Sequence, residues 1–197
     1  MRRALIVVDV QNDFCPGGKL AVPGGDEVVP LVNRLARGFK HVVLTQDWHP
    51  AEHKSFATQH PAKNPFETAM MHYGHQTLWP DHCVQGTPGA DFHPHLQATK
   101  AQMIVRKGFH TGIDSYSAFY ENDKATPTGL AGYLRERGMV VAEREGNWMI
   151  YSLPKKRDAE LEVNLKCLQD CVQTDATFKR DLKALSKLRA KRDEPSV

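Results

Sequence analysis

The sequence has no long apolar run, few cysteines and almost no net charge, and each of these shortages excludes a class of protein. No apolar stretch reaches the roughly 18 residues of a membrane span. The four cysteines among 197 residues show no zinc-finger spacing. A net charge of +3 does not indicate a nucleic-acid-binding composition. What remains is one domain, or one domain with an appendage.

The apolar run near the start of the chain is also too short for a secretory signal. It begins at Ala4 and meets Asp9 after five residues, and no small-residue cleavage site follows. We therefore expect a cytoplasmic protein, with reduced thiols and no membrane segment.

The composition changes abruptly near residue 138. Residues 1–138 hold all ten histidines, 13 of the 14 glycines and 10 of the 12 prolines. Residues 139–197 hold 22 charged residues, against 27 in the much longer segment before them. We therefore predict two segments of different kind, residues 1–138 and 139–197.

The first segment alternates apolar strands with amphipathic helices. Continuous β-branched runs are typical of buried parallel strands and occur at residues 4–10, 41–47 and 102–107. Helical apolar spacing followed by glycine occurs at residues 26–39 and 128–136. Residues 48–99 are rich in His, Pro and Gly, and we expect a long functional loop with only short helices. This order predicts an α/β fold with a parallel sheet.

Three charged residues, Asp9, Asp47 and Lys107, each lie at the end of a predicted strand. Ligands of such sheets bind beyond the carboxyl ends of the strands, so we expect the three charges along one crevice. Asp9 and Lys107 could form a structural ion pair. Alternatively, Asp9 could be a general base that the ammonium group keeps ionised.

Histidines accompany two of the loop motifs. Asp47 with His49, and His82 in the sequence WPDH, supply a carboxylate and two imidazoles. This set suits a divalent transition metal with open positions for water or substrate. His53 is a candidate fourth ligand. The alternative, that the histidines of a His-rich loop cluster by chance, stays open.

Several motifs occur in order between residues 3 and 138. They are IVVDVQNDF (6–14), PGG (16–18), TQDWHP (45–50), HKSF (53–56), LWPDHCVQGTPGADFH (78–93), KG (107–108) and DSYSAF (114–119). Together they closely resemble the nicotinamidase/pyrazinamidase branch of the isochorismatase-like hydrolases. The resemblance implies a doubly wound α/β fold. It also implies an activity on a small-molecule substrate, the deamidation of nicotinamide to nicotinate and ammonia in NAD recycling. The reaction would pass through a thioester on a cysteine.

The resemblance also implies roles for individual residues. Asp9 would be the general base, and Lys107 would stabilise charge and lower the pKa of the thiol. The metal ligands would be Asp47, His49 and His82, and the metal, zinc, iron or manganese, would bind the pyridine nitrogen. Phe14 and Trp79 would line the slot for the flat ring, although both could equally be ordinary core residues.

The nucleophile that the family pattern requires is missing. The pattern expects a further strand and a turn with a helix-opening cysteine roughly 40–45 residues after Lys107, where this chain reads EGNWMIYS (145–152). Cys15 and Cys83 lack that context, and Cys171 lies in a helical apolar stripe with Cys167. We therefore expect impaired turnover, or a catalytically dead binder of pyridine carboxamides.

The second segment predicts a β-hairpin over residues 140–153 and charged amphipathic helices over residues 155–191. Residues 134–193 resemble the wing and dimerising tail helix of ArsR-type winged-helix repressors. The recognition helix of such repressors is absent from this sequence, so we expect no nucleic-acid binding, with a DNA-binding regulator as the weaker alternative. The fold class we predict is an incomplete doubly wound α/β sheet followed by the hairpin and helices. Its unpaired sheet edge favours homo-oligomers formed through the tail.

Overall fold

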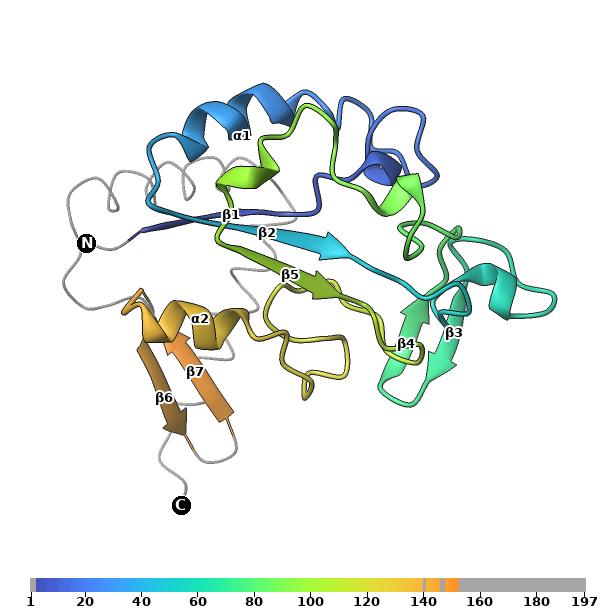
Figure 1. Cartoon of the computed structure of the whole chain (residues 1–197). Helices are drawn as coiled ribbons and strands as arrows, with labels where there is room; N and C mark the ends of the chain where they lie inside the picture. Colours follow the sequence, from blue (N-terminus) through green and yellow to red (C-terminus); the bar gives the residue numbers. More distant parts are fainter. Residues whose placement is uncertain (1–2, 140, 146–147, 153–197) are drawn as a thin grey trace, which may run out of the picture. The chain divides into compact units, whose positions relative to one another are not determined.

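A three-stranded parallel sheet in the order β1–β2–β5 lies at the centre of the fold (Figure 1). The computed structural model describes residues 3–139, 141–145 and 148–152. The strands are β1 (Ala4–Val7), β2 (His41–Asp47) and β5 (Met103–Lys107). The register pairs Asp47 with Lys107, so the ends of β2 and β5 lie side by side. The predicted α/β class with a parallel sheet is confirmed.

The middle strand, β2, is buried on both faces, and a different helix packs against each face. On one face α1 (Val28–Ala36) contributes Val29 to a cluster with Val42 and Leu44. On the other face α2 (Leu130–Glu136) contributes Leu130 and Leu134 to a cluster with Val43. Consecutive residues of β2 thus point into opposite cores, as its continuous apolar sequence indicates.

The segment between β2 and β5 contains more regular structure than the sequence predicts. Short 3-10 turns occur there and in the first loop, at Asn12–Phe14, Ala57–Gln59, Pro88–Ala90 and Ala98–Lys100. The segment also contains an antiparallel pair, β3 (Thr68–Met71) and β4 (Gly74–Thr77). The expectation of short helices alone was therefore wrong for these residues.

Only two strands of the second segment lie within the described residues. β6 (Val141–Glu145) and β7 (Trp148–Ser152) pair antiparallel. Residues 146–147, between the two strands, and the predicted helices of residues 155–191 lie outside the described residues. Residues 2–153 form one compact unit, and the boundary at residue 138 stays a prediction. Within the described residues, no helix is long and apolar enough to cross a membrane.

Candidate functional site

The three charged residues at the strand ends lie together. The Nζ atom of Lys107 lies 2.9 Å from Oδ2 of Asp9 and also contacts Oδ1 of Asp47. It donates a further hydrogen bond of 3.0 Å to the carbonyl oxygen of Ser115. Although burial opposes a charge on Lys107, the two carboxylates raise its pKa. Lys107 is therefore a cation held between two anions in a buried place.

Asp9 adopts a backbone conformation that residues other than glycine rarely take. Its φ is 51°, in the left-handed region, which Asp tolerates better than most residues. The hydroxyl group of Thr45 accepts the backbone N–H of Asp9 and donates to its Oδ1 over 2.6 Å. Burial, together with the charge of Asp47, raises the pKa of Asp9. This carboxylate is thus more basic than usual, a property that suits a general base.

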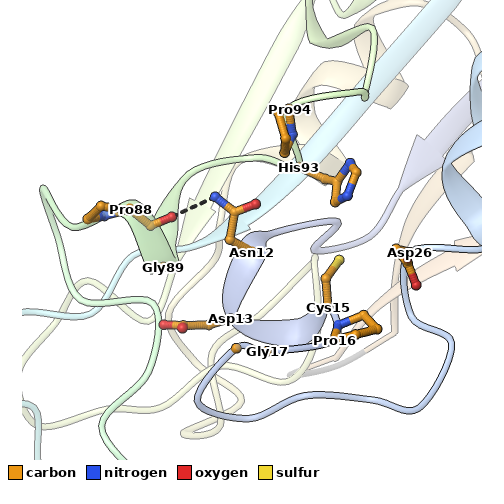
Figure 2. Close-up of a pocket in the computed structure, with 11 residues that line it drawn as sticks. Asn12, Asp13, Cys15, Pro16, Gly17, Asp26, Pro88, Gly89, His93 and Pro94 are labelled. Atoms are coloured by element: carbon orange, nitrogen blue, oxygen red, sulfur yellow. Dashed lines mark hydrogen bonds between the residues drawn. The ribbon is translucent and has the colours of Figure 1, made fainter.

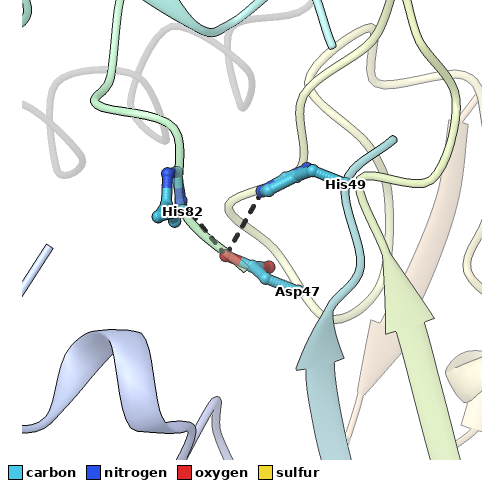
Figure 3. Close-up of side chains that lie close together, drawn as sticks. All are labelled: Asp47, His49 and His82. Atoms are coloured by element: carbon cyan, nitrogen blue, oxygen red, sulfur yellow. Dashed lines mark ion pairs between the residues drawn. The ribbon is translucent and has the colours of Figure 1, made fainter. Parts of the chain in front are cut away.

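A second cluster, Asp47, His49 and His82, adjoins the first through Asp47 (Figure 3). Oδ2 of Asp47 lies 3.7 Å from Nε2 of His49 and 4.0 Å from Nε2 of His82. All three residues are buried, and His49 is fully buried. Both imidazoles therefore turn a nitrogen atom toward one carboxylate oxygen, at distances too long for hydrogen bonds.

Backbone carbonyl groups fix the orientation of both imidazole rings. Nδ1 of His49 lies 2.8 Å from the oxygen of Gly108, and Nδ1 of His82 lies 2.8 Å from the oxygen of Pro80. Because a carbonyl oxygen only accepts, each Nδ1 donates and each Nε2 of the neutral ring carries a lone pair. Nε2 of His49 is buried without a hydrogen-bond partner. The residues present therefore fit a divalent metal ion bound between them.

Close approach of the backbone makes this arrangement depend on glycine. Gly108 has a φ of 64°, and a Cβ atom there would lie 2.4 Å from the His49 ring.

The electrostatics of the cluster also favour a positive charge beside Asp47 and His49. Burial lowers the pKa of His49, but the Asp47 carboxylate reverses the effect and raises it above its ordinary value. A metal ion would supply the same positive charge in place of the proton.

His53 lies beside the cluster, but its two ring nitrogens already have partners. Nδ1 lies 2.7 Å from the hydroxyl oxygen of Ser55, and Nε2 lies 3.2 Å from the carbonyl oxygen of Ile113. Burial and the neighbouring His49 lower the pKa of His53 to about 4. His53 also belongs to a second group of potential ligand atoms, with His49 and Asp114. A role as fourth ligand beside Asp47 stays a prediction.

The two aromatic residues expected to hold a flat ring lie in different surroundings. Phe14 packs edge-on against His82, with the ring centroids 5.6 Å apart. Trp79 contacts Tyr116, to whose hydroxyl oxygen its Nε1 donates a hydrogen bond of 3.2 Å. Phe56, to which the sequence motifs assigned no role, is fully buried and packs against the His49 and His82 rings. Its place in the HKSF motif (53–56), three residues after His53, is the sequence signal that points to it.

Neither cysteine within residues 3–139 has the surroundings of a reactive thiol. Burial, reinforced by Asp26, raises the pKa of Cys15. Burial and the charge of Asp47 raise the pKa of Cys83 even further. Both thiols are therefore poor sources of thiolate.

Cys15 lies in the wall of a separate hollow (Figure 2). This cavity of about 420 Å³ lies between the first loop and residues 88–94, and Asp26 and His93 also line it. Neither the charged cluster nor the metal-ligand group is among its lining residues.

Comparison with known proteins points to one family. The model of the isochorismatase domain matches residues 3–141. A nicotinamidase of Acinetobacter baylyi is 60% identical over 136 residues, which are 69% of this chain and 64% of that relative. The solved structure of the Acinetobacter baumanii nicotinamidase/pyrazinamidase is 62% identical, with a TM-score of 0.67, over 68% of this chain and 65% of the other.

A solved structure of a pyrazinamidase from Pyrococcus horikoshii contains zinc. It is 40% identical to this chain, with a TM-score of 0.51, and the match covers 68% of this chain and 64% of the other. This chain thus spans slightly less than two thirds of the length of each of these three relatives.

Proposed function

The chain belongs to the isochorismatase family, and from this premise we propose that it is a nicotinamidase-type, metal-dependent amidohydrolase of impaired turnover. Its substrate class is the pyridine or pyrazine carboxamides, with nicotinamide giving nicotinate and ammonia for NAD recycling. The similarity to nicotinamidases at 60% and 62% identity supports the reaction class. The group of Asp47, His49 and His82, with both Nε2 atoms turned toward one carboxylate oxygen, is the observation that carries the metal site.

The residues of the chain divide the work between binding and proton transfer. Asp47, His49 and His82 would hold zinc, iron or manganese, which would act as a Lewis acid for the pyridine nitrogen and so orient the ring. Phe14 and Trp79 would flank the ring, and Phe14 already packs against His82. Asp9 would accept a proton, since its pKa is raised, and the ammonium group of Lys107 would stabilise the negative charge that develops.

The missing nucleophile is the reason for proposing impaired turnover. The resemblance implies a cysteine thioester, but the sequence has no cysteine between Cys83 and Cys167. Cys83 is fully buried, and its pKa is raised. Within residues 3–139, therefore, no cysteine offers a thiol of ordinary acidity that Asp9 and Lys107 could activate as the nucleophile.

The proposal is tested by the rate of ammonia release from nicotinamide by zinc-loaded protein. We expect a rate far below the roughly 1–10³ per second that is usual for enzymes. A rate within that range would overturn the proposed impairment. Replacing each of the four cysteines by Ala would then locate the nucleophile. An Asp9→Asn variant would show whether the residual rate depends on the general base.

The buried thiols favour a second candidate function, a metal-dependent binder of pyridine carboxamides that performs no catalysis. Binding of nicotinamide that is lost on adding a chelator, without ammonia release, would support this candidate. Absence of binding would remove it.

A third candidate, a dimeric DNA-binding regulator, rests on the resemblance of residues 134–193 to ArsR-type repressors, and most of these residues lie outside the described part of the chain. A gel shift that persists after deletion of residues 139–197 would remove this candidate, because the wing and tail helix would then be dispensable.

A further inference from the structure

One short stretch, residues 11–13, holds the backbone of both segments that carry the metal-ligand group. The Gln11 side chain is fully buried. Its Oε1 accepts the backbone N–H of Asp47, and its Nε2 donates to the carbonyl oxygens of Asp47 and Ala90, each over 2.8 Å. β1 ends at Val7, so it provides no backbone partner beside the end of β2. A side-chain amide has the same donor and acceptor as a peptide group and takes this place.

Asp13 holds the other segment in the same way. Its buried carboxylate accepts the backbone N–H of Cys83 over 2.7 Å and that of Lys19 over 3.1 Å. Cys83 directly follows His82 and has a φ of 46°, a left-handed conformation that costs free energy in a non-glycine residue. The charge-assisted hydrogen bond that the Cys83 N–H donates to the Asp13 carboxylate offsets this cost. Asp13 thereby fixes the turn from which His82 projects.

The two segments are also joined to each other, and one glycine leaves space for the Asp13 side chain. The backbone N–H of His49 donates to the carbonyl oxygen of Cys83 over 3.0 Å. The absence of a side chain at Gly89 leaves space for Asp13, because a Cβ atom at Gly89 would lie 2.1 Å from Asp13 Oδ2. The stretch thus contacts the segment of Asp47 and His49 through Gln11, and the segment of His82 through Asp13.

We propose that Gln11 and Asp13 are positioning residues, which hold Asp47 and His82 at the separation that a divalent metal ion requires. Neither residue touches the ion, and each acts through the backbone of a ligand or of its neighbour. The inference rests on the proposed metal site and goes beyond it, since it assigns the geometry of that site to two residues outside the ligand set. Outer-shell partners of metal ligands typically contribute 10–100-fold to affinity.

Asn12 provides a matched control within the same stretch. Its side chain donates its hydrogen bond to the carbonyl oxygen of Pro88 over 2.7 Å (Figure 2), not to Asp47 or Cys83. Asn12→Ala therefore changes this loop without changing the hydrogen bonds to either ligand segment.

The test measures Co²⁺ binding to Gln11→Ala, Asp13→Asn and Asn12→Ala by chelator competition, together with the absorption spectrum of the Co²⁺ form. Asp13→Asn keeps the shape of the side chain but removes one of its two acceptors. We expect Co²⁺ to bind 10–100-fold more weakly to Gln11→Ala and Asp13→Asn, with an altered Co²⁺ spectrum. Asn12→Ala should stay within about twofold of the parent, since its only change is in an outer contact.

Urea unfolding of the metal-free variants separates positioning from general stability. Equal Co²⁺ affinity and an unchanged spectrum in both variants would overturn the inference, as would an affinity loss of the same size in Asn12→Ala. If Gln11→Ala does not fold, Asp13→Asn decides alone. If the parent itself binds no Co²⁺, the proposed metal site fails and this inference fails with it, whereas tight parent binding with unaffected variants overturns the inference only.

Discussion

The candidate metal-ligand group and the charged cluster of Asp9, Asp47 and Lys107 share one residue, Asp47. It contacts Lys107 on one side and faces His49 on the other. On the metal side, both rings are oriented by backbone carbonyl groups, and one buried nitrogen has no partner. On the reaction side, Asp9 and Lys107 are paired, but the two thiols within residues 3–139, Cys15 and Cys83, are buried and have raised pKa values. In the proposed function, this difference corresponds to a site that keeps its binding geometry while its chemistry is interrupted.

The largest expected effect concerns the shared charges. In metal-free protein, Lys107→Met removes the cation between Asp9 and Asp47, and leaves the buried carboxylate of Asp47 and the half-buried carboxylate of Asp9 uncompensated. We expect the free energy of unfolding in urea to fall by about 3–5 kcal/mol. Lys100→Met, at an exposed position, should change it by less than about 0.5 kcal/mol. A similar small change in both variants would show that the two halves are not coupled through Lys107.

The metal half alone is tested by His49→Ala. This change removes a ligand nitrogen, so Zn²⁺ affinity measured by chelator competition should fall by more than about 100-fold, beyond the effect of outer-shell partners. His75→Ala, an exposed histidine on β4, should leave the affinity unchanged. Equal losses in the two variants would mean that the protein binds Zn²⁺ elsewhere.

The reaction half is tested by thiol alkylation. Burial raises the pKa of Cys15 and Cys83, so iodoacetamide at pH 8 should modify each at least about tenfold more slowly in folded than in urea-unfolded protein. Peptide mass spectrometry follows each cysteine separately. Rapid modification of either cysteine in the folded protein would make that cysteine a candidate for the catalytic nucleophile.

The smallest expected effect concerns the ring slot. Trp79→Ala should weaken nicotinamide binding about tenfold, or about 1.4 kcal/mol, since an aromatic wall is lost. Met70→Ala, which truncates an exposed side chain, serves as the control. An unchanged Kd for Trp79→Ala would place Trp79 outside the slot, among its contacts with Phe66 and Tyr116.

The central strands could be predicted because burial leaves a strong signal in the sequence. β2 has the predicted bounds, and α1 lies within its predicted range of 26–39. The meeting of Asp9, Asp47 and Lys107 followed from the rule for strand ends. β3 and β4 were missed because a short, largely polar pair of strands carries little apolar periodicity.

The supporting residues of the site were beyond sequence reasoning for a physical reason. Gln11 and Asp13 form hydrogen bonds with backbone atoms of Asp47 and Cys83. Because every such backbone group is the same whatever the side chain, the residue types of the partners do not reveal these contacts. Likewise, the orientation of His49 depends on the carbonyl group of Gly108. Residue types therefore indicated the candidate ligands, whereas their geometry had to come from the fold.

Calorimetric titration of zinc-loaded protein with nicotinamide tests the central claim most directly, because it reports binding and turnover together. We predict a saturable heat of binding that disappears when a chelator removes the metal. The steady thermal power afterwards should correspond to turnover far below about 1 per second. Steady power that corresponds to turnover of about 1–10³ per second would contradict the interrupted chemistry. Absence of any binding heat would contradict the retained binding half.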